Sequence, residues 1–406
     1  MKEDLVGICG MGEDKAGAIS RTINLLGEAG KLLPQGGDSV LIKPNLGWNK
    51  PWQTGTTTSP HFISSLIEVI EERNPASIIV GECPSIGMVG EDVFRETGYD
   101  RLRDMGVEVR DLGKDPTFTI KLPGNSLLKH VDLPESYRSA DYIINVPVIK
   151  THVNTCVTIA CKNLKGLLPS AEKKRFHFLG LDRCIAELVS VVRNDLVIVD
   201  GGVGQEGLGP ISGTPVEIGA TIAGTNPVAV DATCIKAMGI NISRVKHLEI
   251  AMNMGLCPGQ GRIRVVGERP PNLFRPFKLP PEDFSGAYRG VNIIQGNACS
   301  GCIGALTVSL ERMSEAGELD TLAERLGCIN IALGPEAEVE GKEGKWILMG
   351  NCLRAQAERG RFVPGCSPQG WYVRDVIRSL IGLPPLFVDE SLLDYGEENV
   401  TGRNGE

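Results

Sequence analysis

The sequence lacks the features that mark several broad classes of protein. No apolar run approaches the roughly 18 residues that a membrane-spanning helix needs. Basic residues are not in excess, because 42 lysines and arginines face 50 aspartates and glutamates, so a general binder of nucleic-acid phosphates is not expected. The first ten residues, MKEDLVGICG, begin with charged side chains and do not form a secretory signal peptide. We therefore expect a cytoplasmic protein with neither a membrane nor a nucleic-acid partner.

Cysteine is plentiful instead. The chain has twelve cysteines, which in a cytoplasmic protein predict metal ligands or buried thiols rather than disulfides. In three fragments, GNACSGCIGAL, KWILMGNC and FVPGCSP, cysteine follows an apolar, strand-like run and a turn-forming residue. These fragments contain Cys299, Cys302, Cys352 and Cys366. Four thiolates converging from neighbouring strand ends suit a four-iron cluster or a tetrahedral zinc ion, and the pattern also leaves thiols without a metal open.

The same fragments resemble a known arrangement. KWILMGNC followed by FVPGCSPQGWYVRDVIRSLIG is similar to the cluster-binding stretch of quinone oxidoreductase B subunits and nickel–iron hydrogenase small subunits. Those proteins carry G-x-C after one strand and V-P-G-C-x-P after the next, with an earlier cysteine pair opening a helix. The resemblance covers about residues 289–385 and implies a flavodoxin-like fold with one [4Fe-4S] cluster. The ligands that it implies are Cys299, Cys302, Cys352 and Cys366.

The first two-thirds of the chain alternate strand and helix signals. Short β-branched runs begin at Val40, Ser77, Val107, Tyr142 and Leu196, and helical periodicities run from Phe62 to Glu72 and from Cys184 to Val192. Such alternation predicts an α/β fold in which helices cover a mixed or parallel sheet. In folds of this kind, ligands bind at the carboxyl ends of the strands.

Composition divides the chain into four parts. Residues 1–268 are expected to form a large α/β domain that binds an anion or substrate. Residues 269–288 contain five prolines without a periodic pattern and are interpreted as a linker. Residues 289–385 are the predicted iron–sulfur domain, a smaller α/β domain. Residues 386–406 carry six acids and one arginine and are interpreted as an acidic tail.

Four motifs in the large domain, each expected at or after a strand end, carry unusual polar clusters, and the glycines of the third motif are expected to form a loop. In chain order they are K-P-N after a strand, V-x-K-T-H followed by C-K-N-L-K-G, D-G followed by G-x-G-P-x-x-G, and N-P-V-A-V-D. Together they resemble the family called domain of unknown function 362, over roughly residues 1–268. The resemblance implies little about mechanism. Members of the family often carry an added iron–sulfur module, which agrees with the cysteine pattern.

These motifs predict a pocket for an anion. Lys43, Lys150, Lys162 and Lys165 are expected at one strand-end edge, and histidines that titrate near neutrality lie in the same segments. Lysines surrounded by hydroxyl and backbone N–H donors suit a carboxylate or a phosphate. The alternative is that each lysine is an ordinary solvated surface residue.

Each polar residue of the pocket receives a predicted role. Lys150, His152 and His177 are the candidate catalytic residues, because each can exchange a proton with a substrate. The predicted substrate-binding residues are Lys43, Asn45, Thr56, Thr57, Lys162, Asn163, Lys165, Asp200, Glu206 and Asp231. The three acids of this set are expected to compensate the lysine charges. Cys156 or Cys161 is a candidate reactive thiol, because nearby lysines would lower a thiol pKa.

The sequence thus predicts an iron–sulfur oxidoreductase. An anionic small molecule or cofactor would bind in the lysine and histidine pocket, while a [4Fe-4S] cluster exchanges electrons with it and with a redox partner such as a ferredoxin. One alternative is an electron-transfer subunit or cofactor-maturation factor without chemistry of its own. Another is a non-redox enzyme with structural zinc. Assembly into a homo-oligomer is left open.

Overall fold

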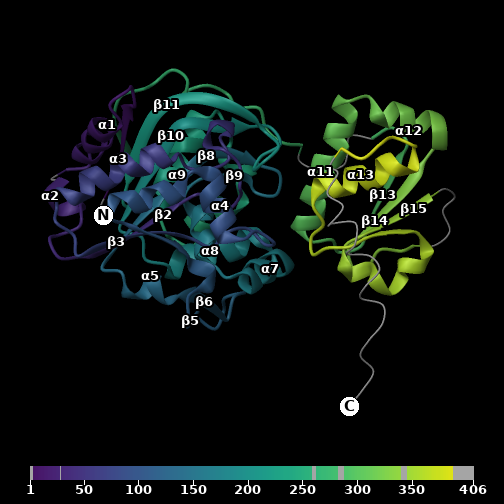
Figure 1. The fold of residues 1–406 in the computed structure, drawn as a ribbon, viewed down its shortest axis with the longest axis horizontal. Coiled ribbons are helices and arrows are strands. Elements are labelled where there is room, and N and C mark those ends of the chain that lie inside the picture. Colours follow the sequence, from purple (N-terminus) through teal and green to yellow (C-terminus); the bar gives the residue numbers. More distant parts are fainter. Residues whose placement is uncertain (1–2, 28, 258–261, 282–287, 340–344, 387–406) are drawn as a thin grey trace, which may run out of the picture. The chain divides into compact units, whose positions relative to one another are not determined.

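The chain forms two compact units. The computed structural model describes residues 3–27, 29–257, 262–281, 288–339 and 345–386. We call Met1–Pro280 the large unit and Pro281–Glu406 the small unit, and describe each by itself (Figure 1). The boundary falls inside the proline-rich segment at 269–288. No helix in the described part of the chain is long and apolar enough to cross a membrane.

A ten-stranded mixed sheet forms the centre of the large unit (Figure 1). Its strands are β1 (Asp4–Gly10), β2 (Ser39–Pro44), β3 (Ser77–Glu82), β4 (Glu108–Asp111), β7 (Tyr142–Val146), β8 (Val148–His152), β9 (Cys156–Thr158), β10 (Leu196–Glu206), β11 (Thr214–Gly224) and β12 (Ile263–Gly267). The main order is β12-β1-β11-β10-β7-β2-β3-β4, and β8 pairs with β10 and β9. β2, β3, β4, β7 and β10 are parallel, whereas β11 is antiparallel to β1 and β10. The predicted α/β fold with a mixed, mostly parallel sheet is confirmed.

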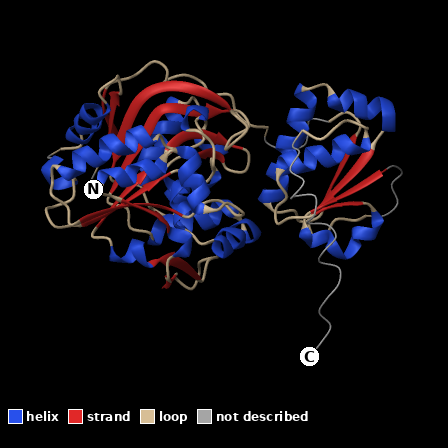
Figure 2. Cartoon of the chain, in the orientation of Figure 1, coloured by secondary structure: helices blue, strands red, loops and turns tan. Residues whose placement is uncertain are grey.

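Helices cover both faces of this sheet (Figure 2). They are α1 (Lys15–Asn24), α2 (Ala29–Leu32), α3 (Pro60–Glu71), α4 (Gly90–Thr97), α5 (Glu135–Ser139), α6 (Ala160–Asn163), α7 (Ser170–Leu179), α8 (Leu181–Val191), α9 (Pro227–Ala237) and α10 (Lys246–Asn253). Successive strand residues point to opposite faces, so Val40 and Ile42 join a core with α1 and α3, while Leu41 joins a core with α8 and α9. Burial on both faces explains why the strands are continuously apolar. A separate hairpin pairs β5 (Thr117–Lys121) with β6 (His130–Pro134).

Two segments differ from their predicted form. Residues 200–206 were expected to be a glycine-rich loop, but they continue β10 and pair with β11. The glycines are needed there because neighbouring backbone is close: a Cβ on Gly204 would lie 2.5 Å from the Ile149 carbonyl oxygen. The N-P-V-A-V-D motif was expected at a strand end, but Asn226 caps α9 by accepting from the Val228 N–H at 2.9 Å. Asparagine before proline is a common helix start, and it puts Asp231 inside the helix.

Part of the predicted linker is packed into the large unit. Leu273 and Phe277 are buried in the same core as α8 and α9. The Phe277 N–H donates to the Met238 carbonyl at 3.0 Å. Residues 269–280 are therefore part of the large unit and not a linker, because the apolar side chains between the prolines are buried. Residues 282–287 of the predicted linker, and 387–406 of the predicted tail, lie outside the described residues.

The small unit is built on a four-stranded parallel sheet with sequential order. Its elements are β13 (Val291–Gln295), α11 (Ser300–Glu315), α12 (Glu318–Leu326), β14 (Ile329–Leu333), β15 (Lys345–Met349), the 3₁₀ segment η7 (Asn351–Arg359), β16 (Arg361–Val363) and α13 (Gly370–Leu380). Side chains of α11 and α13 pack on one face of the sheet, and Leu353 of η7 packs on the other. The expected second, smaller α/β unit is confirmed.

Candidate functional site

The four candidate cysteines of the small unit lie at the carboxyl edge of its sheet. Cys299 is the N-cap residue of α11, and Cys302 lies in the first turn of that helix. Cys352 follows β15 after Gly350, which has a φ of 101° that favours glycine, and Cys366 follows β16. Because β13, β15 and β16 are parallel, their carboxyl ends share one edge. We call these four cysteines the cysteine edge.

The thiols of the cysteine edge face one another. A Cβ on Gly350 would lie 3.2 Å from the Cys302 sulfur and 3.5 Å from the Cys352 sulfur, so these two thiols flank the glycine. The Cys302 thiol donates a hydrogen bond to the Cys299 sulfur, which lowers the pKa of Cys299 to about 6 and raises that of Cys302. Charge on Cys352 and Cys366 further raises the pKa of Cys302. The residues therefore form one electrostatic group.

The spacing of these sulfurs is wider than a zinc ion requires. Four ligands at the usual Zn–S distance lie about 3.8 Å from one another. Among the described residues, the group of three or more candidate ligand atoms that all lie within 4.8 Å is His130, Asp132 and Glu172, and it contains no cysteine. That group already holds a cation, because the Arg175 guanidinium pairs with Glu172 and His130. In the part of the chain that the structure describes, no three sulfurs of the cysteine edge therefore all lie within 4.8 Å of one another.

Access to the cysteine edge is uneven. Cys302 is buried and Cys299 is half-buried, whereas Cys352 and Cys366 are exposed. Burial raises the pKa of Cys352, and the backbone N–H of Gly334, which donates to the Cys352 sulfur, opposes this shift. An edge with two exposed ligands would leave a bound group open to a partner from the solvent side.

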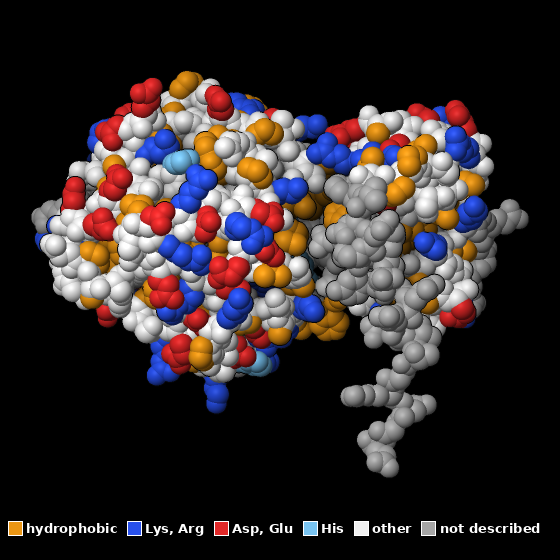
Figure 3. All heavy atoms as spheres, viewed as in Figure 1, with side chains coloured by type: hydrophobic (Ala, Val, Ile, Leu, Met, Phe, Trp, Pro, Cys, Tyr) orange, Lys and Arg blue, Asp and Glu red, His pale blue; other side chains and the backbone are white. Residues whose placement is uncertain are grey.

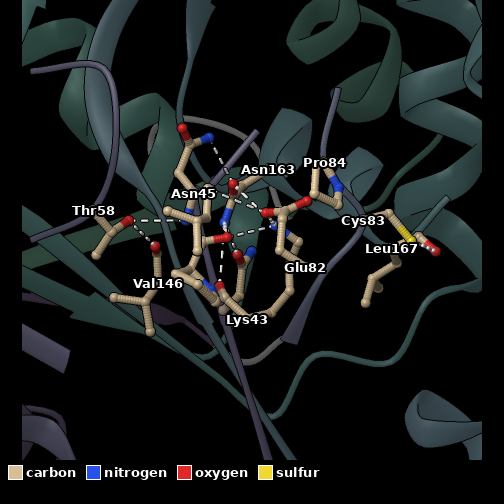
Figure 4. A network of polar contacts seen from close by, with 12 residues as sticks. Lys43, Asn45, Thr58, Glu82, Cys83, Pro84, Val146, Asn163 and Leu167 are labelled. Carbon is tan, nitrogen blue, oxygen red and sulfur yellow. Dashed lines mark hydrogen bonds and ion pairs between the residues drawn. The ribbon is translucent and has the colours of Figure 1, made fainter. Parts of the chain in front are cut away.

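In the large unit, Lys43 is the centre of a closed polar network at the end of β2 (Figure 4). Its side chain is fully buried, and Nζ donates to the Glu82 carboxylate at 2.6 Å, the Pro44 carbonyl at 2.6 Å and Asn163 Oδ1 at 3.3 Å. Asn45 Nδ2 donates to the same Asn163 oxygen at 2.8 Å. Burial lowers the pKa of Lys43 and raises that of Glu82, and the contact between them opposes both shifts.

Lys150 lies beside this network on β8 and is held differently. Its Nζ donates to Asn45 Oδ1 at 2.8 Å and to the Thr56 carbonyl. Both acceptors are uncharged, and no carboxylate in the described part of the chain forms an ion pair with Lys150. Burial lowers the pKa of Lys150 to about 7. Its charge is therefore only partly compensated.

Four more basic side chains lie around Lys150: His152 on β8, Lys162 on α6, Lys165 in the 3₁₀ turn η4 (Leu164–Leu167) and His177 on α7. Burial, then Lys162, Lys150 and Lys165, lowers the pKa of His152, so these groups are close enough to act on one another. Burial, followed by the charge of Lys150, lowers the pKa of Lys162 to about 7. Within the described residues the Lys162 ammonium makes no hydrogen bond or ion pair. We call Lys43, Lys150, His152, Lys162, Lys165 and His177 the lysine site.

Both histidines of the lysine site are neutral. His152 Nδ1 accepts the Asn154 backbone N–H at 3.0 Å, so its ring proton is on Nε2. Lys165 Nζ lies 2.9 Å from His177 Nε2, and burial lowers the pKa of His177 to about 2. Neither ring is the readily protonated base expected from its residue type. They can act as neutral hydrogen-bond partners of an anion.

The three acids predicted to compensate the lysines bind elsewhere. Asp200 accepts the Ser59 N–H at 2.8 Å, at the start of α3. Asp231 accepts the Ala160 and Cys161 N–H groups at 2.7 and 3.1 Å. Glu206 pairs with Arg275 at 3.1 Å. The prediction of lysine pairing was wrong for all three, because backbone donors and an arginine are nearer.

The compensating acid is Glu82, which sequence reasoning missed. It ends β3, which runs parallel to β2 and next to it, so its carboxylate reaches Lys43 at the shared edge. The signal was present in the sequence, since Ser77-Ile-Ile-Val-Gly-Glu82 is a buried strand that ends in an acid. Parallel neighbours, however, cannot be identified from one sequence without knowing the strand order.

Four other predicted residues lie at or beyond the border of the site. Thr56 contributes its carbonyl to Lys150. Thr57 donates its hydroxyl to the Lys50 carbonyl at 2.9 Å and, among the described residues, makes no hydrogen bond with the lysine site. Cys161 is fully buried and burial raises its pKa, so it is not a reactive thiol, whereas Cys156 is half-buried on β9.

The lysines of the site are not part of a general basic surface on the face drawn in Figure 3. There, lysine and arginine side chains are interspersed with aspartate and glutamate over the large unit. This distribution agrees with the excess of acidic over basic residues in the whole chain.

Comparisons with known proteins agree with the motifs of the large unit. Residues 40–236 match the family described as Domain of unknown function (DUF362). The thylakoid-associated protein sll1697 of Synechocystis is 26% identical over 261 residues, which are 61% of this chain and 79% of that protein. A crystal structure of a Thermotoga maritima protein aligns with 70% of this chain at a TM-score of 0.36 and 12% identity. The alignment spans 63% of that chain, less than two thirds of its length. Residues 40–236 of this chain are therefore similar to the DUF362 family, and the chain is similar to the Synechocystis protein.

Proposed function

We propose that this chain is an iron–sulfur oxidoreductase that binds a small anion at the lysine site and a [4Fe-4S] cluster at the cysteine edge. The observation that carries the proposal is a group of buried and half-buried basic side chains without matching carboxylates. Glu82 is the acid in contact with Lys43, while Lys150 and Lys162 have no carboxylate partner among the described residues. Buried like charges are unfavourable unless an anion compensates them.

Each residue of the lysine site has a definite part in binding the anion. Lys162 supplies a side-chain nitrogen whose donors are unused, and Lys165 supplies a second nitrogen, which lies 2.9 Å from His177 Nε2. His152 supplies its Nε2–H without adding charge, because its Nδ1 accepts the Asn154 N–H. Lys43 and Glu82 fix the inner wall and do not need the ligand for their own hydrogen bonds. Carboxylates and phosphates both fit such a set of donors.

The cysteine edge supports the redox part of the proposal. Cys299, Cys302, Cys352 and Cys366 would hold the cluster, which when bound supplies one-electron transfer. The Gly334 N–H beside Cys352 adds a hydrogen bond to a ligand sulfur, and such bonds raise the reduction potential of a cluster. The two exposed cysteines suit electron exchange with a soluble partner such as a ferredoxin. We propose a cytoplasmic location, where a chain with twelve cysteines is expected to use them as metal ligands or buried thiols.

Two measurements test the parts of this proposal separately. Anaerobic purification with iron, sulfide and zinc analysis should give about four irons and four sulfides per chain with a broad visible absorption. Stoichiometric zinc in a colourless protein would contradict the redox function.

Calorimetric titration with sulfate should give a single saturable site in the wild type and none in Lys162→Met. If sulfate does not bind, the electron-carrier alternative without a substrate site is preferred.

A further inference from the structure

Two lysines of the same site have different hydrogen-bond partners. Lys43 Nζ has three acceptors, one of them the Glu82 carboxylate, which matches the three N–H groups of an ammonium. Lys150 Nζ has two acceptors, Asn45 Oδ1 and the Thr56 carbonyl, and neither is charged. Two donated bonds are what a neutral amine can make, and its third position is then a lone pair. The geometry of Lys150 therefore fits an –NH₂ group.

The surroundings of Lys150 favour the same form. Its side chain is 2% exposed, so water does not stabilise a charge there. Burial lowers its pKa to about 7, and the charge of Lys43 works in the same direction. The charge of Glu82 opposes this lowering of the Lys150 pKa, but the Glu82 carboxylate is in contact with Lys43 and not with Lys150. A lysine that is desolvated and next to another cation is an activated nucleophile.

An unused hydroxyl lies next to Lys150. Thr158 on β9 is the cross-strand partner of Lys150, and the two side chains share one face of the β8–β9 ladder. Thr158 is 3% exposed, and its Oγ1 is buried without a hydrogen-bond partner. His152 lies two residues along β8 on the same face. A ligand with oxygen atoms at this face would complete the hydrogen bonds of Thr158 and of His152 Nε2.

We propose that Lys150 is a nucleophilic amine that forms an imine with an anionic aldehyde or ketone. This inference rests on the proposed binding of an anion at the lysine site. The Lys150 lone pair forms a bond to the carbonyl carbon, and the carbonyl oxygen leaves as water with the two protons of the amine. One carbonyl and one amine thus give one imine and one water, without an oxidant or reductant. Lys162 and Lys165 bind the anionic part of the substrate.

The test uses pyridoxal 5′-phosphate, an anionic aldehyde, followed by borohydride, which reduces an imine to a stable secondary amine. Peptide mapping by mass spectrometry of the full-length protein should locate the adduct at Lys150. Lys43 and Lys173 are internal controls in the same digest. Both are buried, but each has a carboxylate nearby. Lys43 contacts Glu82. Lys173 donates to the Pro84 carbonyl at 2.6 Å, and the charges of Glu82 and Asp111 oppose the lowering of its pKa by burial. Neither should be labelled.

Charge recognition is tested with 5-deoxypyridoxal, which lacks the phosphate and also lacks the 5′-hydroxyl that would close the aldehyde into a hemiacetal. Labelling of Lys150 by the phosphorylated probe should be about tenfold faster, as expected for one charge-assisted contact, and sulfate should protect it. Lys162→Met should remove this preference for the phosphorylated probe. Labelling spread over surface lysines, or confined to Lys162 or Lys165, overturns the role of Lys150. If sulfate still binds in that case, the proposed anion site stands without the imine; if sulfate does not bind, both fail.

Discussion

The lysine site and the cysteine edge satisfy their polar groups in different ways. At the lysine site most donors already have partners within the protein: Lys43 uses three acceptors, and Lys150 uses two. At the cysteine edge, Cys352 and Cys366 are exposed, and the thiols interact mainly with one another. The first site is therefore a pre-organised polar network with a few unused groups, and the second is a group of thiols that interact mainly with one another.

This difference has consequences for stability. Removing an internal partner from the lysine site leaves a buried charge, which is strongly destabilising. Removing a thiol from the cysteine edge changes a side chain in a turn or at a helix start. We expect it to reduce metal content more than it reduces the free energy of unfolding. Four experiments test this comparison.

The largest effect is expected at the cysteine edge. Cys302→Ser should abolish the bound cluster, because this buried thiol faces the other three sulfurs and serine is a poor ligand for iron. The measurement is iron and sulfide content with the visible spectrum after anaerobic purification. Cys328→Ser is the matched control, since Cys328 lies before β14, away from the carboxyl edge. Loss of colour in the control with retention in Cys302→Ser would refute the ligand assignment.

The next effect concerns the internal partner of Lys43. Glu82→Gln removes the buried carboxylate that contacts Lys43 at 2.6 Å. Breaking a buried ion pair in this way costs about 3–5 kcal/mol of unfolding free energy. Glu206→Gln is the control, because its pair with Arg275 is partly exposed and should contribute at most about 1 kcal/mol. Urea unfolding of both variants measures the difference. Equal losses would mean that the lysine site is not held together by this pair.

Glu82 also illustrates which parts of the molecule could be predicted from the sequence. The strands at Val40 and Tyr142 were predictable, because buried parallel strands are short apolar runs. The cysteine edge was predictable too, because each thiol is next to a turn glycine or helix start in its own fragment. The partners of the lysines were not. Lys43 and Glu82 are 39 residues apart, and only the strand order brings them together.

The misplaced acids show the same limit. Asp231 follows a motif that reads as a strand end, yet Asn226 and Pro227 start a helix there. Asp200 lies at the predicted strand end, but the start of α3 provides an N–H group that a carboxylate accepts readily. Local sequence identifies where charged side chains lie along the chain. It does not decide between a backbone donor and a lysine as the partner.

A third experiment uses pH to separate compensated from uncompensated lysines. Burial lowers the pKa of Lys150 and of Lys162 to about 7 from 10.5. Between these values the unfolded chain binds more protons than the folded one, so the stability of the ligand-free protein should rise with pH across this window. Bound sulfate favours the charged lysines, so its affinity should fall above pH 7, by about tenfold per pH unit for each proton taken up.

Calorimetry with sulfate from pH 6.5 to 9 measures how the sulfate affinity falls with pH. Melting temperatures of the ligand-free protein over the same range measure how its stability rises with pH. Lys162→Met should flatten the rise in stability with pH. A stability that falls from pH 7 to 9 in the wild type, with no flattening in the variant, would show that these lysines are charged and compensated in the folded protein.

The smallest expected effect comes from the unused hydroxyl of the lysine site. Thr158→Val keeps the shape of the side chain and removes a buried Oγ1 that has no hydrogen-bond partner in the described structure. Removing an unsatisfied buried hydroxyl relieves a desolvation penalty of about 1 kcal/mol, so the ligand-free variant should unfold at the same temperature or slightly higher. Sulfate should bind several-fold more weakly, because the ligand loses one donor. Thr151→Val is the contrast, since the Thr151 hydroxyl donates to the Gly207 carbonyl at 2.9 Å and its removal should destabilise the protein. If Thr158→Val were destabilising to the same degree as Thr151→Val, the Thr158 hydroxyl would have an internal partner and would not be available to a ligand.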